Sequence, residues 1–319
     1  MIHLRVAVPA ELSDAVLAVL RADPAVATLA VHRSASLKPA GDVIVADVAR
    51  EAVNDIVDEL RALGVADVGT LHLDPLPTWM SRAGLEAEQL APGSPADAVV
   101  WASVTQQAYE ESELNWSYVS FMALATLLAG VAIIIDSPIL VIGAMVLGPE
   151  FTAIAALGVA LVRHRGHLFT RAARTLLGGF AAAIAVTTLL TLLGRALGWV
   201  QLADITGPRP GTDFIYTPDK WSFVVAVIAA AAGVLSLTSA RVGGLSGVFI
   251  SVTTIPAAAN VAVGLAFGAG GEIGGSALQL VVNLTGMAVA GWLVLWLQQV
   301  VWRRVSAYRR RLLARRTAA

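Results

Sequence analysis

Apolar runs of membrane-spanning length fill most of the chain beyond Trp116. A transmembrane helix needs about 20 apolar residues to cross roughly 30 Å of hydrocarbon. The composition agrees, because 57% of the 319 residues are apolar and 14% are charged, whereas soluble domains carry about 25% charged residues. The sequence therefore predicts a multi-pass membrane protein with six spans, at residues 117–135, 139–162, 175–194, 222–240, 245–268 and 277–302.

The N-terminal part has the pattern of a soluble α/β domain. Ile2, Leu4, Val6 and Val8 alternate with other residues, which is the period of a half-buried strand. A helical face, two further strands, a second helical face and a last strand follow before Pro75. The order βαββαβ predicts a ferredoxin-like fold, and the fold class of the whole chain is α+β. This small fold serves sensors, metal modules and dimerisation platforms, so it does not fix a function.

Four segments follow from these patterns. Residues 1–75 form the ferredoxin-like domain, and 76–116 form a linker rich in Pro, Gly, Ser and Ala that ends in an amphipathic helix. Residues 117–302 form the six-span transmembrane domain, and 303–319 form a basic cytoplasmic tail.

The arginines predict the orientation of the spans. An even number of spans places both termini on one side of the membrane, and the connections and tail on that side hold twelve basic residues against three on the other. The positive-inside rule therefore predicts cytoplasmic N- and C-termini in the cytoplasmic membrane. The twelve are Arg163, Arg165, Arg171, Arg174, Arg241, Arg303, Arg304, Arg309, Arg310, Arg311, Arg315 and Arg316, and the three are Arg195, Arg209 and Lys220.

A helix breaker and an acid interrupt the second span at Gly148, Pro149 and Glu150. Proline removes a backbone hydrogen bond and clashes with the preceding turn. Glu150 lies twelve residues after Pro138, about 18 Å along a helix axis and near the bilayer centre. A carboxylate at that depth faces a bundle interior or a wet cavity. We expect a broken helix there and a coupling role for Glu150, the alternative being a protonated Glu that packs against a neighbouring helix.

The fifth and sixth spans carry polar residues that are candidates for the same substrate or ion site. They are Thr253, Thr254, Pro256 and Asn260 in the fifth span, with Asn283 in the sixth. Gln279 and Asn283, one turn apart in the sixth span, have less weight than the residues of the fifth span. The alternative is plain interhelical hydrogen bonding, which small and polar residues commonly provide. Asp136, at the outer end of the first hairpin, is a candidate gate or an ordinary turn residue.

A weak internal repeat relates the two halves of the membrane domain, with offsets that grow from 102 to 104 residues. Three spans separate the halves, and an odd number reverses orientation, so the repeat is predicted to be inverted, in a 3+3 arrangement with broken helices. The matched pairs are Ser120-Phe121 with Ser222-Phe223, Gly130 with Gly233, Gly143 with Gly247 and, a few residues out of register, Pro149 with Pro256.

Several function classes find no support in the sequence. The net charge of −1 gives no basic field for nucleic acid, and the absence of cysteine excludes disulfides and thiolate metal sites. No Ser-Lys, His-Glu-x-x-His or paired-Asp motif suggests an intramembrane enzyme. We expect no enzyme, no cofactor and no metal.

Two blocks of the membrane domain resemble a known family. The first is Asp136-Ser137-Pro138, Ile142-Gly143-Ala144-Met145 and Pro149, and the second joins residues 236–241 to residues 251–260. They resemble the hydrophobic bacterial and archaeal family catalogued as domain of unknown function 389, over roughly residues 120–265. This resemblance implies membership and no activity.

These patterns lead to a hypothesis of function. We expect an integral membrane transporter or permease for a small solute or ion, coupled to protons or cations through Glu150, whose partners are the lipid bilayer and a second copy of the chain in a homo-oligomer such as a dimer. Two alternatives remain open, a passive channel with the same site and a membrane-anchored sensor with a ligand-binding cytoplasmic domain.

Overall fold

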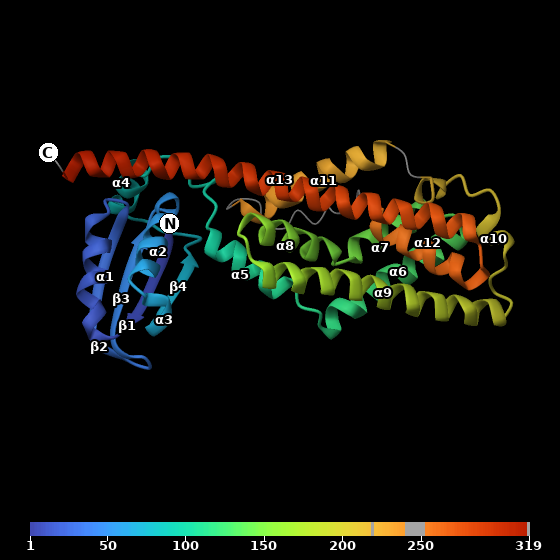
Figure 1. Ribbon diagram of the computed structural model, residues 1–319, viewed down its shortest axis with the longest axis horizontal. Helices are drawn as coiled ribbons and strands as arrows, with labels where there is room; N and C mark the ends of the chain where they lie inside the picture. Colours follow the sequence, from blue (N-terminus) through green and yellow to red (C-terminus); the bar gives the residue numbers. More distant parts are fainter. Residues whose placement is uncertain (218–219, 240–252, 318–319) are drawn as a thin grey trace. The chain divides into compact units, whose positions relative to one another are not determined.

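The computed structural model describes residues 1–217, 220–239 and 253–317 (Figure 1). Contacts divide the chain into two compact units. Among the described residues, the sheet unit comprises 1–104, 238–239 and 298–317, and the helical unit comprises 105–237 and 253–297.

The sheet unit contains a four-stranded antiparallel sheet with helices packed against it. Its elements are β1 (Ile2–Val8), α1 (Ala10–Ala22), β2 (Val26–Leu37), β3 (Ala40–Val48), the 3₁₀ helix η1 (Arg50–Ala52), α2 (Val53–Ala62), α3 (Val65–Val68) and β4 (Thr70–Pro75). The strand order is β2-β3-β1-β4, and every neighbouring pair is antiparallel. Together with the helical region that follows, this sheet confirms the mixed α+β class.

Alternation along β1 fixes the core of the sheet unit. Leu4 and Val6 are buried and join one cluster with Leu20 of α1 and with Ile56 and Leu60 of α2. Leu4 stands opposite Ala46 of β3 on one side and Leu73 of β4 on the other, so β1 is one of the two interior strands of the sheet. The two helices bury the stripes expected for amphipathic helices.

Two helices lie between the sheet and the first apolar helix, α4 (Arg82–Leu90) and α5 (Trp101–Glu111). Ser81 caps α4, because its side chain accepts a hydrogen bond from the Gly84 backbone N–H at 3.1 Å. The side chain of Asn54 fixes the entry to α5 by bonding the Val99 carbonyl at 2.7 Å and the Trp101 backbone N–H at 3.1 Å. The segment expected to be a linker is thus partly helical.

The helical unit is built from apolar helices. They are α6 (Trp116–Ile134), α7 (Pro138–Leu147), α8 (Glu150–Val162), α9 (Gly166–Ala196), α10 (Ala203–Thr206), the 3₁₀ helix η2 (Asp213–Ile215), α11 (Lys220–Thr238), α12 (Thr254–Phe267) and the part of α13 (Gly270–Thr317) that precedes residue 298. Four of them, α6, α9, α11 and α13, are long and apolar enough to cross a membrane. The number rises to five if the pair α7 and α8, bent by 52° at a short break, is taken as one span. Multi-pass membrane character is therefore supported.

The fifth expected span, 245–268, lies partly outside the described residues. Its described part is α12, which has 14 residues and is shorter than a membrane crossing. Within the described residues, the structure therefore accounts for four or five spans.

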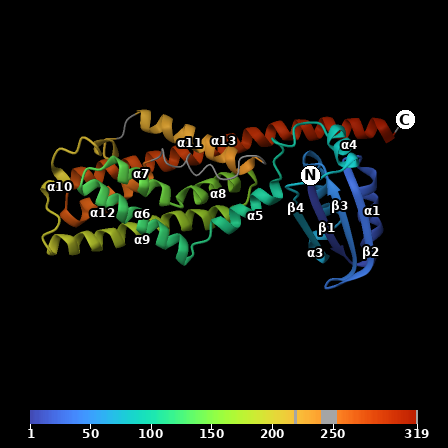
Figure 2. The same ribbon diagram turned by 180° about the vertical axis from the view of Figure 1, so that it is seen from behind.

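Two helices extend beyond the spans expected from hydropathy. α9 begins at Gly166 instead of residue 175, and α13 continues to Thr317 through the expected basic tail. Figure 1 and Figure 2 show α13 as one unbroken helix. Arginine limits an apolar span but is a good helix former, so hydropathy marks the end of the apolar run and not the end of the helix.

The last turns of α13 are joined to the sheet unit by a buried ion pair. Nη1 of Arg309 donates to Oδ2 of Asp55 at 3.0 Å, and Nη2 donates to Asp23, which caps the C-terminus of α1. The Arg309 side chain is 4% exposed, so water screens this cluster little.

Replacing Arg309 is expected to destabilise the sheet unit. Arg309→Gln leaves Asp23 and Asp55 without their shared cation, and breaking a buried pair by removing one partner costs about 3–5 kcal/mol. Amide hydrogen exchange of α1 and α2 in the full chain measures the effect. The exposed Arg311 is the matched control. Equal protection in Arg309→Gln and Arg311→Gln would contradict a stabilising role for the cluster.

Asp42 in β3 is held in its ionised form. Its carboxylate accepts hydrogen bonds from the Ser13 hydroxyl at 2.6 Å, the Ser34 backbone N–H at 2.7 Å and the Arg33 guanidinium at 2.7 Å. These donors, Ser13 first, lower the pKa of Asp42 from 3.8 to about 2.

The sheet unit should therefore lose stability in a defined acidic range. Because the folded state lowers the pKa of Asp42, its contribution is complete above the unfolded pKa of 3.8 and is lost as the pH falls toward about 2. Asp42→Asn should lower the denaturant midpoint at pH 7 and flatten its fall between these two pH values, as followed by hydrogen exchange of β3. Asp14, the exposed partner of the same Arg33, is the control. A midpoint that falls as steeply in Asp42→Asn as in Asp14→Asn would rule out Asp42 as the cause.

Candidate functional site

Gly148 and Pro149 separate two helices inside the second apolar run. Gly148 caps α7 in an extended conformation, and Pro149 stands before Glu150, the first residue of α8. Proline has no backbone N–H with which to continue α7, so the chain turns and starts a new helix. The break expected from the sequence lies at these residues.

The described part of the fifth run also starts a helix among its polar residues. Thr253 is the N-cap position of α12, and Thr254 is its first residue. Pro256 stands in the first turn, where a missing N–H leaves no helical hydrogen bond unmade. Two helices of similar length, α8 and α12, thus begin with an acid and a threonine respectively.

The first residues of these two helices bond to each other. The Thr254 hydroxyl donates to Oε1 of Glu150 at 2.6 Å, and the two side chains are 0% and 6% exposed. The N-terminus of a helix carries a partial positive charge. A carboxylate beside two such termini is electrostatically favourable, and so is any anionic group that replaces it.

Gly148 leaves the space that the Glu150 carboxylate occupies. A Cβ at Gly148 would collide with Oε2 of Glu150 and would lie 2.7 Å from Cγ1 of Ile255. Oε2 itself is buried without a hydrogen-bond partner in the described parts of the chain. Gly148, Pro149 and Glu150 therefore act as one unit, in which the break exposes the helix end and the glycine admits the acid.

A second group of polar side chains meets at Thr253, next to the pair just described. Nε2 of Gln279 and Nδ2 of Asn283 both donate to the Thr253 hydroxyl, at 3.1 Å and 3.0 Å. The carbonyl oxygens of both amides are buried and have no partner among residues 1–217, 220–239 and 253–317. With Oε2 of Glu150, three buried oxygens remain available to a proton donor or a cation.

Asn260 belongs to a different network. Its side-chain nitrogen donates to Ser276 and to Glu272, both at 2.8 Å, and its oxygen accepts from Nη1 of Arg209 at 3.2 Å. Arg209 also pairs with Glu272 at 2.7 Å and lies over the ring of Tyr216, 4.9 Å from its centroid. The structure does not bring Asn260 into hydrogen-bond contact with Glu150.

Asp136 binds the connection between α9 and α11, which also carries Arg209. Its carboxylate accepts hydrogen bonds from the Gly211 backbone N–H at 3.1 Å and from the Thr212 hydroxyl at 2.8 Å. The candidate gate residue is thus a fixed contact to the segment that carries Arg209. Sequence reasoning missed Arg209, Thr212, Glu272 and Ser276. The available signal was an arginine between two prolines, Pro208 and Pro210, with an unassigned acid in a glycine-rich connection.

Comparison with protein families agrees with the resemblance drawn from the sequence. Residues 145–289 match the family described as Domain of unknown function (DUF389). The matched range contains both helix starts, both amides and the Arg209 network. The match confirms the resemblance for this part of the chain. Neither a curated protein nor a solved structure matches the chain significantly.

Gly148→Ala is expected to displace the Glu150 carboxylate. The added methyl meets Oε2 and Ile255 at once, and overpacking of this kind costs about 1–3 kcal/mol. The thermal midpoint of the purified protein in detergent measures the loss. Gly143→Ala in the same helix is the control, because its Cβ would only touch Leu128 at 4.0 Å. A Gly148→Ala variant as stable as Gly143→Ala would contradict the close approach of Glu150.

Proposed function

We propose that this protein is a secondary transporter or ion-coupled permease for a small solute or ion, with Glu150 as its coupling group. The observation that carries the proposal is the buried hydrogen bond between Glu150 and Thr254, the first residues of two helices that start inside apolar runs. Secondary transporters commonly place substrate and coupling-ion sites where interrupted helices meet at the midplane.

The position of this contact supports an inverted repeat. Glu150 and Thr254 are 104 residues apart, the same offset as Gly143 and Gly247 in the sequence repeat. Equivalent residues of an inverted repeat face each other across its axis where they lie close to it. A contact between the equivalent first residues of α8 and α12 is what such an arrangement predicts.

The unpaired oxygens support a role in coupling. Oε2 of Glu150 and the carbonyl oxygens of Gln279 and Asn283 are buried acceptors. A proton or a cation that moves with the substrate supplies what these oxygens lack. Binding at Oε2 weakens the hold of the carboxylate on Thr254, and this changes the contact between the two broken runs. We infer that occupancy of the site and the packing of α8 against α12 are coupled in this way.

The proposal also includes the fold of the N-terminal domain, the orientation of the termini and the assembly of the chain. The βαββαβ order and the strand order β2-β3-β1-β4 favour a ferredoxin-like domain. The excess of arginine in the expected inner connections favours cytoplasmic termini in the cytoplasmic membrane, and a homo-oligomer such as a dimer is the expected assembly. No enzyme activity is proposed.

A membrane-anchored sensor is the second candidate function. The observation in its favour is α13, a single helix whose residues belong to both units and whose end binds Asp23 and Asp55 through Arg309. A ligand on the sheet unit would then act on the membrane helices through α13. A sensor of this kind moves no ion, which separates it from the transporter.

Ion flux through proteoliposomes tests the proposal. The purified chain should dissipate an imposed gradient of H⁺, Na⁺ or K⁺, followed with a pH dye and ion-selective dyes. Glu150→Gln should fall to the rate of empty liposomes, because the amide neither binds a proton nor attracts a cation. Thr254→Val should lose about fivefold, the equivalent of one hydrogen bond of roughly 1 kcal/mol.

Thr188→Val is the matched control, because Thr188 bonds the Ala262 carbonyl in the same unit, away from Glu150. Unchanged flux in Glu150→Gln removes the carboxylate from the mechanism. Absence of flux from the wild-type protein under all three gradients contradicts the transporter and leaves the sensor. Unitary currents without saturable exchange identify a channel instead.

A further inference from the structure

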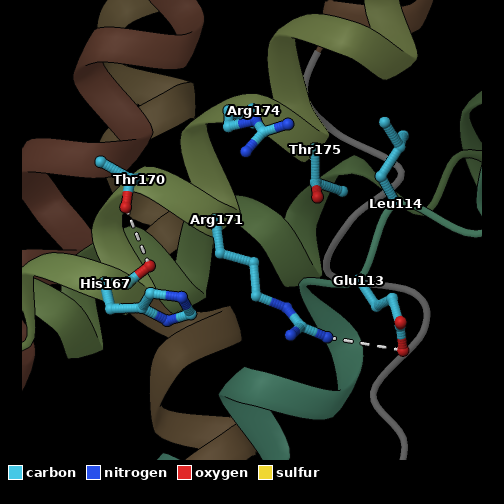
Figure 3. A pocket seen from close by; sticks show the side chains of 7 residues that line it. All are labelled: Glu113, Leu114, His167, Thr170, Arg171, Arg174 and Thr175. Atoms are coloured by element: carbon cyan, nitrogen blue, oxygen red, sulfur yellow. Dashed lines mark hydrogen bonds and ion pairs between the residues drawn. The ribbon is translucent and has the colours of Figure 1, made fainter.

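A polar cavity of about 370 Å³ lies at the start of α9, within the helical unit (Figure 3). One wall is the first turns of α9, and the other is the connector of residues 112–115 between α5 and α6. Nothing in the transport proposal uses this cavity.

Helical spacing lines the first wall with basic and hydroxyl groups. His167, Thr170, Arg171 and Arg174 follow one another at intervals of three, one and three residues, so they share one face of α9. In Figure 3 their side chains lie along that wall, opposite Glu113. The helix begins at Gly166, so its positive end adds to the same field.

The connector is held in place against this face. The hydroxyl of Thr175 donates to the Ser112 carbonyl at 2.7 Å, and both residues are buried. Leu114 packs over Gly178, where a Cβ would lie 3.3 Å from Cδ2 of Leu114. The ring of Tyr109 stacks on that of His167, with centroids 6.3 Å apart. The cavity is therefore a built feature with fixed walls.

Positive charge exceeds negative charge in the cavity. Arg171 and Arg174 face one acid, Glu113, whose Oε2 lies 3.4 Å from Nη2 of Arg171. Nε of Arg171 is buried without an acceptor, and Arg174 has no ion pair in the part of the chain that the structure describes. The donors of two guanidinium groups are thus only partly used.

The cavity opens beside exposed apolar side chains. Leu114 and Trp116 on the connector side are 48% and 84% exposed, and Leu177 is 68% exposed. Leu177 follows Arg174 by three residues on the same face of α9. A basic pocket with exposed apolar residues on the same helix face and on its connector matches a phospholipid, with its phosphate beside the arginines and its acyl chains along the leucines.

We propose that this cavity binds a phosphate ester anion through Arg171 and Arg174. Planar guanidinium groups bind phosphate oxygens with paired hydrogen bonds, and the ring of His167 adds a donor at the same wall. The phosphate takes the place of Glu113 on Arg171, so Glu113 is its internal competitor. The phosphate belongs either to an anionic phospholipid or to a soluble phosphate ester.

Native mass spectrometry of the full chain separates these sources. The probes are phosphatidylglycerol, zwitterionic phosphatidylcholine and soluble glycerol 3-phosphate. The wild-type protein should retain phosphatidylglycerol over phosphatidylcholine, and Arg171→Gln/Arg174→Gln should weaken that binding at least about tenfold, the equivalent of a charged hydrogen bond. Arg165→Gln, which removes a neighbouring charge outside the cavity, should bind as the wild type does.

Glu113→Gln supplies a variant with the opposite effect. Removing the competing carboxylate should tighten binding by about threefold, the value of one exposed ion pair. Binding of glycerol 3-phosphate that needs the same two arginines supports the site and assigns it to a soluble ester. Equal binding of phosphatidylglycerol by the wild type and the double variant, or weaker binding by Glu113→Gln, overturns the proposal.

Discussion

The buried contact between Glu150 and Thr254 is the interaction on which the helical unit depends. An apolar run of 24 residues, 139–162, would favour a single straight span. Pro149 prevents this, and the Glu150 carboxylate at the start of α8 must find polar partners inside the protein because lipid offers none. The threonine that starts α12 supplies one. Gly148 supplies the space, and the 52° bend between α7 and α8 follows.

The polar residues of α12 serve two separate purposes. Thr253 and Thr254, at its start, gather Glu150, Gln279 and Asn283. Asn260, about two turns later, fixes Arg209 and Glu272, while Asp136 fixes the same connection through Thr212. The Arg209 network joins an ion pair to several hydrogen bonds, leaves only the Nε donor of Arg209 without a partner among the described residues, and holds a loop. The Glu150 group keeps three buried oxygens without a partner in the described parts of the chain, so the two are chemically different.

The local sequence pattern predicts more of the fold than of the candidate functional site. Alternation in β1 and the helical stripes of α1 and α2 predict the sheet unit, and hydropathy locates the apolar helices, because each signal is carried by neighbouring residues. Pro149 predicts the break for the same reason. Glu272 lies 63 residues after its partner Arg209, and Asp55 lies 254 residues before its partner Arg309. Nothing in the sequence around either arginine points to these partners. From their charge alone, Arg209 is expected only in an outer loop and Arg309 only in the basic tail. The ion pairs that both residues form are decided by tertiary packing.

A purely structural role explains Glu150 poorly. A serine or threonine at the start of α8 would bond Thr254 without burying a carboxyl group, and it would leave no second oxygen unpaired. Each unsatisfied buried acceptor costs about 1–3 kcal/mol, and within the part of the chain that the structure describes three of them lie around Thr253 and Thr254. This free-energy cost brings no gain in side-chain packing. A site that must bind and release a proton or a cation requires it, because oxygens already paired within the protein have no affinity left for a ligand.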